Sequence, residues 1–193
     1  MPDFASYCEY CVTLPPDDPS RVYHDKEYGF PLMDDAALFG RLILEINQAG
    51  LSWITILKKK ANFERAYGGF DIDTVAAYGP ADVDRLMADA GIIRNRRKID
   101  AAIANARALA ALRASHGSFK AWLDAHHPRG KDDWVKLFKD TFVFVGGEIV
   151  GEFLMSSGYL PGAHVEGCPA GVRAIEAGAA WHRSAGNKTG ERA

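Results

Sequence analysis

Signals that begin and end α-helices recur at short intervals along this sequence and leave little room for a β-sheet. Asp34 and Asp35 are typical N-cap residues, and Gly50 is a typical stop at a helix C-terminus. The alanine-rich segment that begins at Arg96 has high intrinsic helix propensity. Signals of these kinds predict helices over residues 35–49, 52–67, 74–78, 81–90, 96–114, 118–127 and 147–157. The predicted fold class is therefore all-α, with short connections.

Two segments near the C-terminus carry weaker signals. Residues 142–145 have the propensity of a strand, but the segment is short and has no evident partner, so we expect it to lead into the helix at 147. Residues 169–193 are rich in Ala and Gly and are predicted to form a flexible tail. A chain of 193 residues suits one domain, and residues 1–168 are predicted to form a single helical domain of two lobes that share a core.

Composition argues against a membrane-spanning protein and against a secreted protein held by disulfides. No apolar run approaches the roughly 18 residues that a membrane span requires. The N-terminus lacks the basic start and apolar stretch of a secretory signal. Three cysteines are too few for a disulfide scaffold. We therefore expect a cytoplasmic protein with no membrane partner, whose cysteines are available to bind a metal.

Basic residues concentrate in the middle of the chain. Residues 51–120 hold 12 Lys and Arg against 7 Asp and Glu, a local charge of +5, which can hold a polyanion on one face. A basic hairpin is predicted near residues 89–98, where a turn at Gly91 leads into a helix. Its cations are Arg94, Arg96, Arg97 and Lys98. Free N–H groups at a helix start suit a phosphate. The alternative is a solvated helix start, although four cations there oppose the helix dipole.

One carboxylate interrupts an apolar helix face. Leu38, Leu42, Glu45 and Ala49 are spaced so that they share one face, and the other three members should point to the core. A buried carboxylate needs a cation or several donors. Glu45 is therefore either half of an internal salt bridge or the anion of a ligand pocket. Trp53 follows after a tight turn and favours the pocket.

Five residues could bind a metal: Cys8, Cys11, His24, His164 and Cys168. A closed structural zinc site needs four thiolate or imidazole ligands. One full set combines both N-terminal cysteines with His164 and Cys168, and another replaces Cys8 with His24. The remaining interpretation is a group of ordinary buried thiols and scattered histidines.

Several sequence blocks occur in the order typical of the 3-methyladenine DNA glycosylase I family. They are Tyr23–Pro31, Leu44–Lys59, Asp89–Arg94 with Lys98 and Ile99, Asn105–Arg107, Phe144–Gly146, and His164 with Cys168. The blocks cover most of residues 11–168, and their combination is specific where any single block is not. The chain therefore resembles this family.

The resemblance implies a helical fold of the helix-hairpin-helix glycosylase superfamily, with the Gly91 turn as the DNA-anchoring hairpin. It also implies one structural Zn2+ per chain that ties the N-terminal segment to the C-terminal one. The implied ligands are Cys11, His24, His164 and Cys168, which leaves Cys8 as an extra thiol. The implied partner is double-stranded DNA with alkylated bases, and we expect the chain to act as a monomer.

The resemblance further implies a monofunctional DNA glycosylase of base excision repair that removes 3-methyladenine. The base-binding residues would be Tyr23, Tyr28, Glu45 and Trp53, and Leu51 would wedge into the base stack. A base methylated at N3 is cationic while it is attached to DNA, so an anion and aromatic faces suit its recognition. The resemblance thus implies that Glu45 is the catalytic residue, and that it recognises the base by its charge rather than acting as an established proton acceptor.

Two departures from the family pattern concern substrate range and DNA affinity. Ser20 stands where some members have a further pocket tyrosine, and residues 130–141 replace a longer basic stretch.

Two other functions fit the residues. One is a non-catalytic zinc-containing protein that binds damaged DNA, and the other is a metal-dependent hydrolase, which needs a zinc with an open coordination position.

Overall fold

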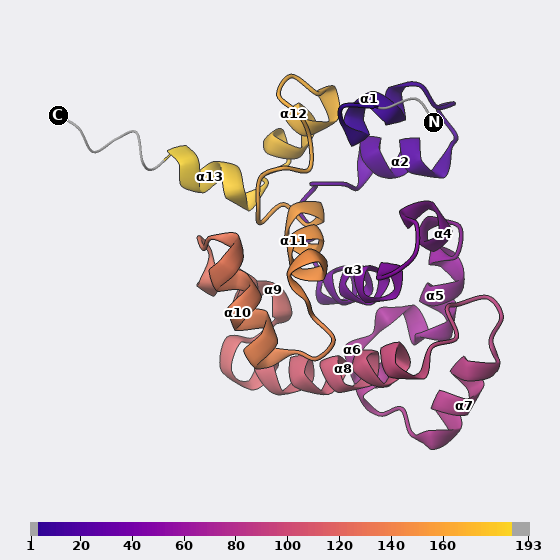
Figure 1. Cartoon of the computed structure of the whole chain (residues 1–193). Helices are drawn as coiled ribbons and strands as arrows, with labels where there is room; N and C mark the ends of the chain where they lie inside the picture. Colours follow the sequence, from indigo (N-terminus) through magenta and orange to yellow (C-terminus); the bar gives the residue numbers. More distant parts are fainter. Residues whose placement is uncertain (1–3, 187–193) are drawn as a thin grey trace. The chain divides into compact units, whose positions relative to one another are not determined.

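The computed structural model describes residues 4–186, which form helices and no strand. The helices are α1 Tyr7–Val12, α2 Pro19–Lys26, α3 Asp35–Gln48, α4 Trp53–Leu57, α5 Lys60–Ala66, α6 Ile72–Ala76, α7 Pro80–Ala88, α8 Arg96–His116, α9 Phe119–His126, α10 Lys131–Thr141, α11 Gly147–Ser156, α12 Pro169–Glu176 and α13 Ala180–Gly186, with a 3-10 turn η1 at Gly68–Phe70 (Figure 1). The predicted fold class is confirmed. No helix in residues 4–186 is long and apolar enough to cross a membrane.

Side-chain caps explain where the main helices begin. The Asp34 carboxylate accepts a hydrogen bond from the Ala37 N–H at the start of α3. Asn95 caps α8, and Ser118 caps α9 in the same way. The predicted helix at 52–67 is divided in the structure, because the chain leaves regular helix geometry at Lys59, where ψ is −2°.

Two features of the C-terminal half differ from what the sequence indicated. The segment 130–141 contains α10, which the sequence analysis did not identify although Trp134 and Phe138 lie one turn apart and are both buried. The segment expected to be a tail contains α12 and α13. Pro169 suits the first position of α12, and Ala170 and Ala174 are buried, so their small size serves close packing. The part of the predicted tail at 187–193 lies outside the described residues.

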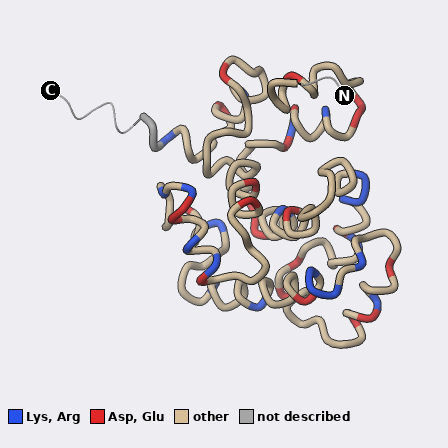
Figure 2. The backbone as a smooth tube through the Cα atoms, viewed as in Figure 1, with Lys and Arg blue, Asp and Glu red and all other residues tan. Residues whose placement is uncertain are grey.

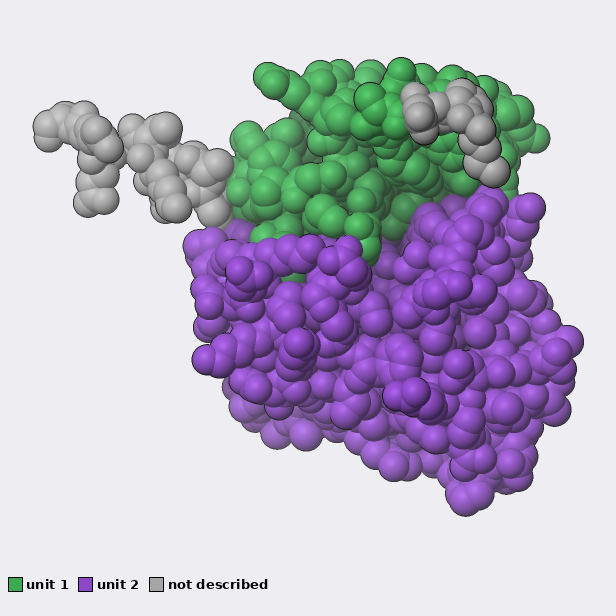
Figure 3. Space-filling model, in the orientation of Figure 1, with its two compact units in different colours: residues 1–32, 152–193 green, residues 33–151 purple. Residues whose placement is uncertain are grey.

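Residues 33–151 form one compact unit (Figure 3). Within it, α8 packs against α3, α6, α7 and α9. A cluster of aromatic rings fixes α9 and α10, with ring centroids 5.3–6.4 Å apart. Its members are Phe119, Trp122, Trp134, Phe138 and Phe142. This unit carries the base-recognition candidates Glu45 and Trp53 and the basic hairpin.

The other compact unit combines both ends of the chain, residues 1–32 and 152–193 (Figure 3). Within it, α2 packs against α1 and α12. This packing brings an N-terminal histidine and a C-terminal cysteine together across most of the sequence. The unit carries the metal-ligand candidates and the tyrosines Tyr23 and Tyr28.

Candidate functional site

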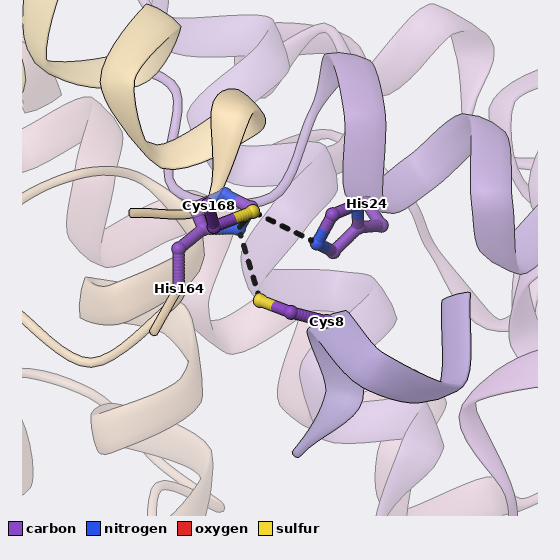
Figure 4. Close-up of side chains that lie close together, drawn as sticks. All are labelled: Cys8, His24, His164 and Cys168. Carbon is purple, nitrogen blue, oxygen red and sulfur yellow. Dashed lines mark hydrogen bonds between the residues drawn. The ribbon is translucent and has the colours of Figure 1, made fainter. Parts of the chain in front are cut away.

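Two cysteines and two histidines converge within the unit that contains both chain ends. Cys8 comes from α1, His24 from α2, His164 from the segment before α12, and Cys168 from the N-cap of α12 (Figure 4). Their donor atoms all lie within 4.8 Å of one another. Three sulfur-to-nitrogen distances are 3.6 Å: Cys8 to His164, Cys168 to His24 and Cys168 to His164.

This donor set fits a tetrahedral zinc ion. Zinc binds sulfur at about 2.3 Å and nitrogen at about 2.0–2.1 Å, so a tetrahedral site separates a sulfur from a nitrogen ligand by about 3.6 Å. The observed separations match this edge length. Two thiols and two imidazoles are also the chemistry that zinc prefers. The residues could therefore hold the metal without large rearrangement.

Hydrogen bonds outside the cluster orient both imidazoles. His24 Nδ1 donates to the Asp25 carboxylate at 2.7 Å, and His164 Nε2 donates to the carbonyl of Tyr28 at 2.7 Å. Each ring thus turns its other nitrogen, with a free lone pair, toward the sulfurs. Burial lowers the pKa of His164, which favours the neutral ring. Partial burial opposes ionisation of Asp25, but hydrogen bonds from Arg21 and His24 bring its pKa below the ordinary value.

The cluster differs in one member from the set that the resemblance implied. Cys8 occupies the position expected for Cys11, while the other three ligands are those named from the sequence. The sulfur of Cys11 instead faces the carbonyl of Ser20 at 3.5 Å. Burial raises the pKa of the Cys11 thiol to about 11, so it stays protonated at neutral pH.

Glu45 is a buried carboxylate in the unit of residues 33–151. It is 4% exposed, and Leu38 and Leu42 on the same face of α3 are fully buried, as the periodicity predicted. Ala49, expected on the same buried face, is only half-buried because α3 ends at Gln48. Arg41 is also buried and lies one turn before Glu45, a spacing at which a guanidinium and a carboxylate share a helix face. An ion pair within α3 is therefore the structural alternative to ligand recognition, and the two make opposite predictions about stability.

The aromatic candidates lie in different units. Trp53 is partly buried at the first position of α4, in the same unit as Glu45. Tyr23 is buried in α2, and its ring centroid lies 5.4 Å from that of Tyr28. The Tyr28 hydroxyl donates to the Glu152 carboxylate at 3.2 Å within their unit. Both tyrosines thus belong to one packed aromatic group.

The basic hairpin contains both exposed and buried groups. Arg94, Arg96 and Arg97 are exposed, and Arg96 pairs with Asp100 at 3.3 Å on the surface. The position of Lys98 does not fit the predicted DNA contact. The residue is 5% exposed, and its ammonium group donates hydrogen bonds to the backbone carbonyls of Asn47 and Ala49.

The turns of this unit place two further DNA-binding candidates. The Gly91 N–H donates to the Asp89 carboxylate at 2.7 Å and so is used within the turn. Leu51 is 39% exposed at the turn after α3. Lys and Arg also gather on the segment that follows α4 (Figure 2). Lys59 and Asn62 in this segment donate hydrogen bonds to the hairpin turn. Neither role was predicted, although the run of three lysines at 58–60 is visible in the sequence.

Comparison with known proteins gives one consistent similarity. Residues 14–133 match the family model described as methyladenine glycosylase. The chain is 38% identical over 179 residues to DNA-3-methyladenine glycosylase 1 of Escherichia coli K12, an alignment that covers 83% of this chain and 95% of the relative. A 3-methyladenine DNA glycosylase I structure from Staphylococcus aureus aligns with a TM-score of 0.76 at 33% identity, covering 86% of this chain and 97% of that one. A Tyr-to-Phe variant of such a glycosylase, solved with 3-methyladenine, aligns with a TM-score of 0.74 at 34% identity and covers 83% and 96% of the two chains.

Proposed function

The chain belongs to the methyladenine glycosylase family, and we propose that it flips 3-methyladenine out of alkylated duplex DNA and hydrolyses its N-glycosidic bond without cutting the strand. It is a hydrolase that acts on N-glycosyl bonds in the repair of alkylated bases. The observation that carries the substrate assignment is the burial of Glu45, 4% exposed, on the face of α3 that also buries Leu38 and Leu42. A buried carboxylate is suited to a cationic ligand, and Arg41 is the competing cation on the same helix.

The chemistry requires little more than recognition of the leaving base. In DNA, 3-methyladenine carries a positive charge, and the electron pair of the broken glycosidic bond neutralises it as the base departs. Water adds to the sugar carbon C1′ and loses a proton. We propose that Glu45 binds the cationic base and that the rings of Tyr23, Tyr28 and Trp53 contribute cation–π attraction of about 0.5–2 kcal/mol.

DNA contact is assigned to exposed groups of the unit of residues 33–151. We propose that the guanidinium groups of Arg94, Arg96 and Arg97 contact phosphates on either side of the flipped nucleotide. Leu51 fills the space that the base leaves in the stack. The protein is proposed to act as a monomer in the cytoplasm.

Release of free base from methylated duplex DNA tests the proposed activity. We expect 3-methyladenine to appear in solution while the DNA strand stays intact, since no lysine nucleophile is assigned. Chromatography of the released bases and denaturing electrophoresis of the DNA measure the two outcomes. Binding without release at any enzyme concentration would instead identify a non-catalytic protein that binds damaged DNA.

We also propose that Cys8, His24, His164 and Cys168 hold one structural Zn2+. Four protein ligands complete a tetrahedral shell and leave no position for a reacting water, so the metal would fix the two ends of the chain rather than take part in hydrolysis. The support is the match of the sulfur-to-nitrogen distances to the edges of a zinc tetrahedron.

Substitution of single cysteines distinguishes Cys8 from Cys11, the two candidate ligands in α1. Cys8→Ser is expected to weaken zinc binding by at least about 10-fold, because loss of a direct ligand costs no less than loss of an outer-shell partner. Cys11→Ser, three residues away on the same helix, is expected to bind zinc like the wild type. Competition with a chromophoric chelator measures both affinities. If only Cys11→Ser loses zinc, the ligands are those that the resemblance implied, with Cys11 in place of Cys8.

A further inference from the structure

Two lysines connect the basic hairpin with the segment that runs from the end of α3 to the start of α5, which includes the turn that carries Leu51. Lys98, in the first turn of α8, donates to the carbonyls of Asn47 and Ala49 at 2.8 and 2.7 Å. Lys59, which follows α4, donates to the carbonyls of Ala90 and Gly91 at 3.0 and 3.1 Å. Lys98 thus binds the backbone at the end of α3, and Lys59, from the junction of α4 and α5, binds the backbone of the hairpin turn. We name Lys59 and Lys98 with these four carbonyls the lysine brace.

The end of α3 explains why Lys98 is buried. The last carbonyls of a helix have no partner within the helix and form the negative end of its dipole. An ammonium group placed there gains hydrogen bonds and a favourable field, which offsets the cost of burial. The side chain is 5% exposed and so is withdrawn from any phosphate. Lys98 lies in the first turn of α8, where a positive charge is unfavourable with the helix dipole. Its ammonium group instead reaches the negative C-terminal end of α3 and stabilises that end.

Two hydrogen bonds close the turn that follows α3. Gln48 accepts a hydrogen bond from the Leu51 N–H at 2.7 Å, and its side chain donates back to the Leu51 carbonyl at 3.0 Å. Gly50 adopts a φ of +82°, which closes the turn in a left-handed conformation. Lys98 holds the base of this turn, so it sets the position of Leu51 relative to α8.

The hairpin turn is also held by side-chain hydrogen bonds to its backbone. Asn62 donates to the Gly91 carbonyl at 3.1 Å beside Lys59. A Cβ atom at position 91 would lie 2.8 Å from the Asp89 carboxylate and 3.3 Å from the Asn62 side chain. A larger residue at position 91 would displace the Asp89 carboxylate from its hydrogen bond with the residue 91 N–H and would crowd Asn62. The hydrogen bond from Asn62 attaches the hairpin turn to α5.

We propose that Lys98 and Lys59 are positioning residues, which fix the distance between the phosphate-binding arginines of the hairpin and the Leu51 wedge so that DNA binding places the wedge for base extrusion. The inference rests on the proposed function. It assigns to Lys98 an internal role in place of the phosphate contact predicted from the sequence, and it gives Lys59 a role that the sequence analysis did not consider.

Lys98→Met and Lys59→Met test the brace, because methionine keeps most of the side-chain volume and removes the donors. We expect the single-turnover rate of 3-methyladenine release at saturating enzyme to fall about 10- to 100-fold, since a displacement on the order of 1 Å has this cost. The enzyme concentration for half-saturation and the salt dependence of duplex binding should stay at wild-type values.

The salt dependence separates a brace from a phosphate contact. Loss of one phosphate contact lowers the slope of log K against log salt concentration by about 0.9. Arg97→Gln, an exposed neighbour, is the control that should show this loss. A Lys98→Met variant with the lower slope and an unchanged single-turnover rate would overturn the proposal, as would unchanged rates in both lysine variants.

Hydrogen exchange separates failure of the brace from failure of the proposed function. Lys98→Met should speed exchange at the amides of residues 49–52 by about 10-fold or more, whether or not the wild-type protein releases base. Circular dichroism confirms that each variant is folded. If Lys98→Met does not fold, Lys59→Met is used, and the faster exchange is then expected at the amides of the hairpin turn that Lys59 binds. Unchanged exchange in these amides would show that Lys98 does not hold the turn.

Discussion

Glu45→Gln will lower the rate of 3-methyladenine release by about 100- to 1,000-fold while the protein stays folded. The substitution keeps the size of the side chain and removes its negative charge, so the attraction to the cationic base is lost in a buried environment, where charges interact strongly. Single-turnover release from methylated duplex DNA measures this effect. Glu64→Gln, at an exposed glutamate of the same unit, is the matched control and should leave the rate unchanged.

The stability of Glu45→Gln distinguishes recognition from an internal ion pair. If the carboxylate serves a ligand, removing its charge should change the free energy of unfolding by less than about 1 kcal/mol or raise it, because a buried charge is costly in the free protein. If Arg41 is its permanent partner, the variant should lose about 3–5 kcal/mol. Urea denaturation measures the difference. A large loss of stability with a normal release rate would support the ion pair.

Removal of zinc is expected to have the second-largest effect. Structural zinc sites contribute on the order of 10 kcal/mol to small domains, and even half of that would lower the melting temperature of a chain of this size by roughly 10–20 °C. The unit of residues 1–32 and 152–193 should respond, since α1, α2 and α12 each carry or flank a ligand. Thermal unfolding before and after chelation measures the shift.

Two controls accompany the chelation experiment. Re-addition of zinc to the chelated protein should restore the melting temperature, and Cys11→Ser should respond to chelation as the wild type does. Equal melting temperatures with and without zinc would contradict a structural metal in this cluster.

The sequence predicted most features that depend on local signals. The cap at Asp34 and the burial of Glu45 followed from residue type and periodicity, and both are confirmed. The helix α10 was missed although its buried aromatics have helical spacing, because charged residues surround them. The composition of α12 was misleading, since Ala and Gly are typical both of flexible chain ends and of closely packed helices.

The features that the sequence could not predict depend on contacts between distant segments. Cys8 and Cys11 lie three residues apart on one helix, and only the position of His164 and Cys168 decides which sulfur joins the cluster. Lys98 belongs to a run of cations, yet its acceptors are backbone carbonyls about fifty residues away, which no side-chain pattern records. Residues that bind backbone are therefore the hardest to assign from sequence.

The carboxyl resonance of Glu45 gives the most direct test of the central claim. Protein labelled with carbon-13 in its glutamate side chains is titrated with 3,9-dimethyladeninium, a cation that models the base while N9 is still bonded, and the resonance missing from Glu45→Gln identifies the residue. We expect this resonance to shift in a saturable way as the base binds. Saturable binding of the base with no change in the Glu45 resonance would contradict its role as the anion that recognises the substrate.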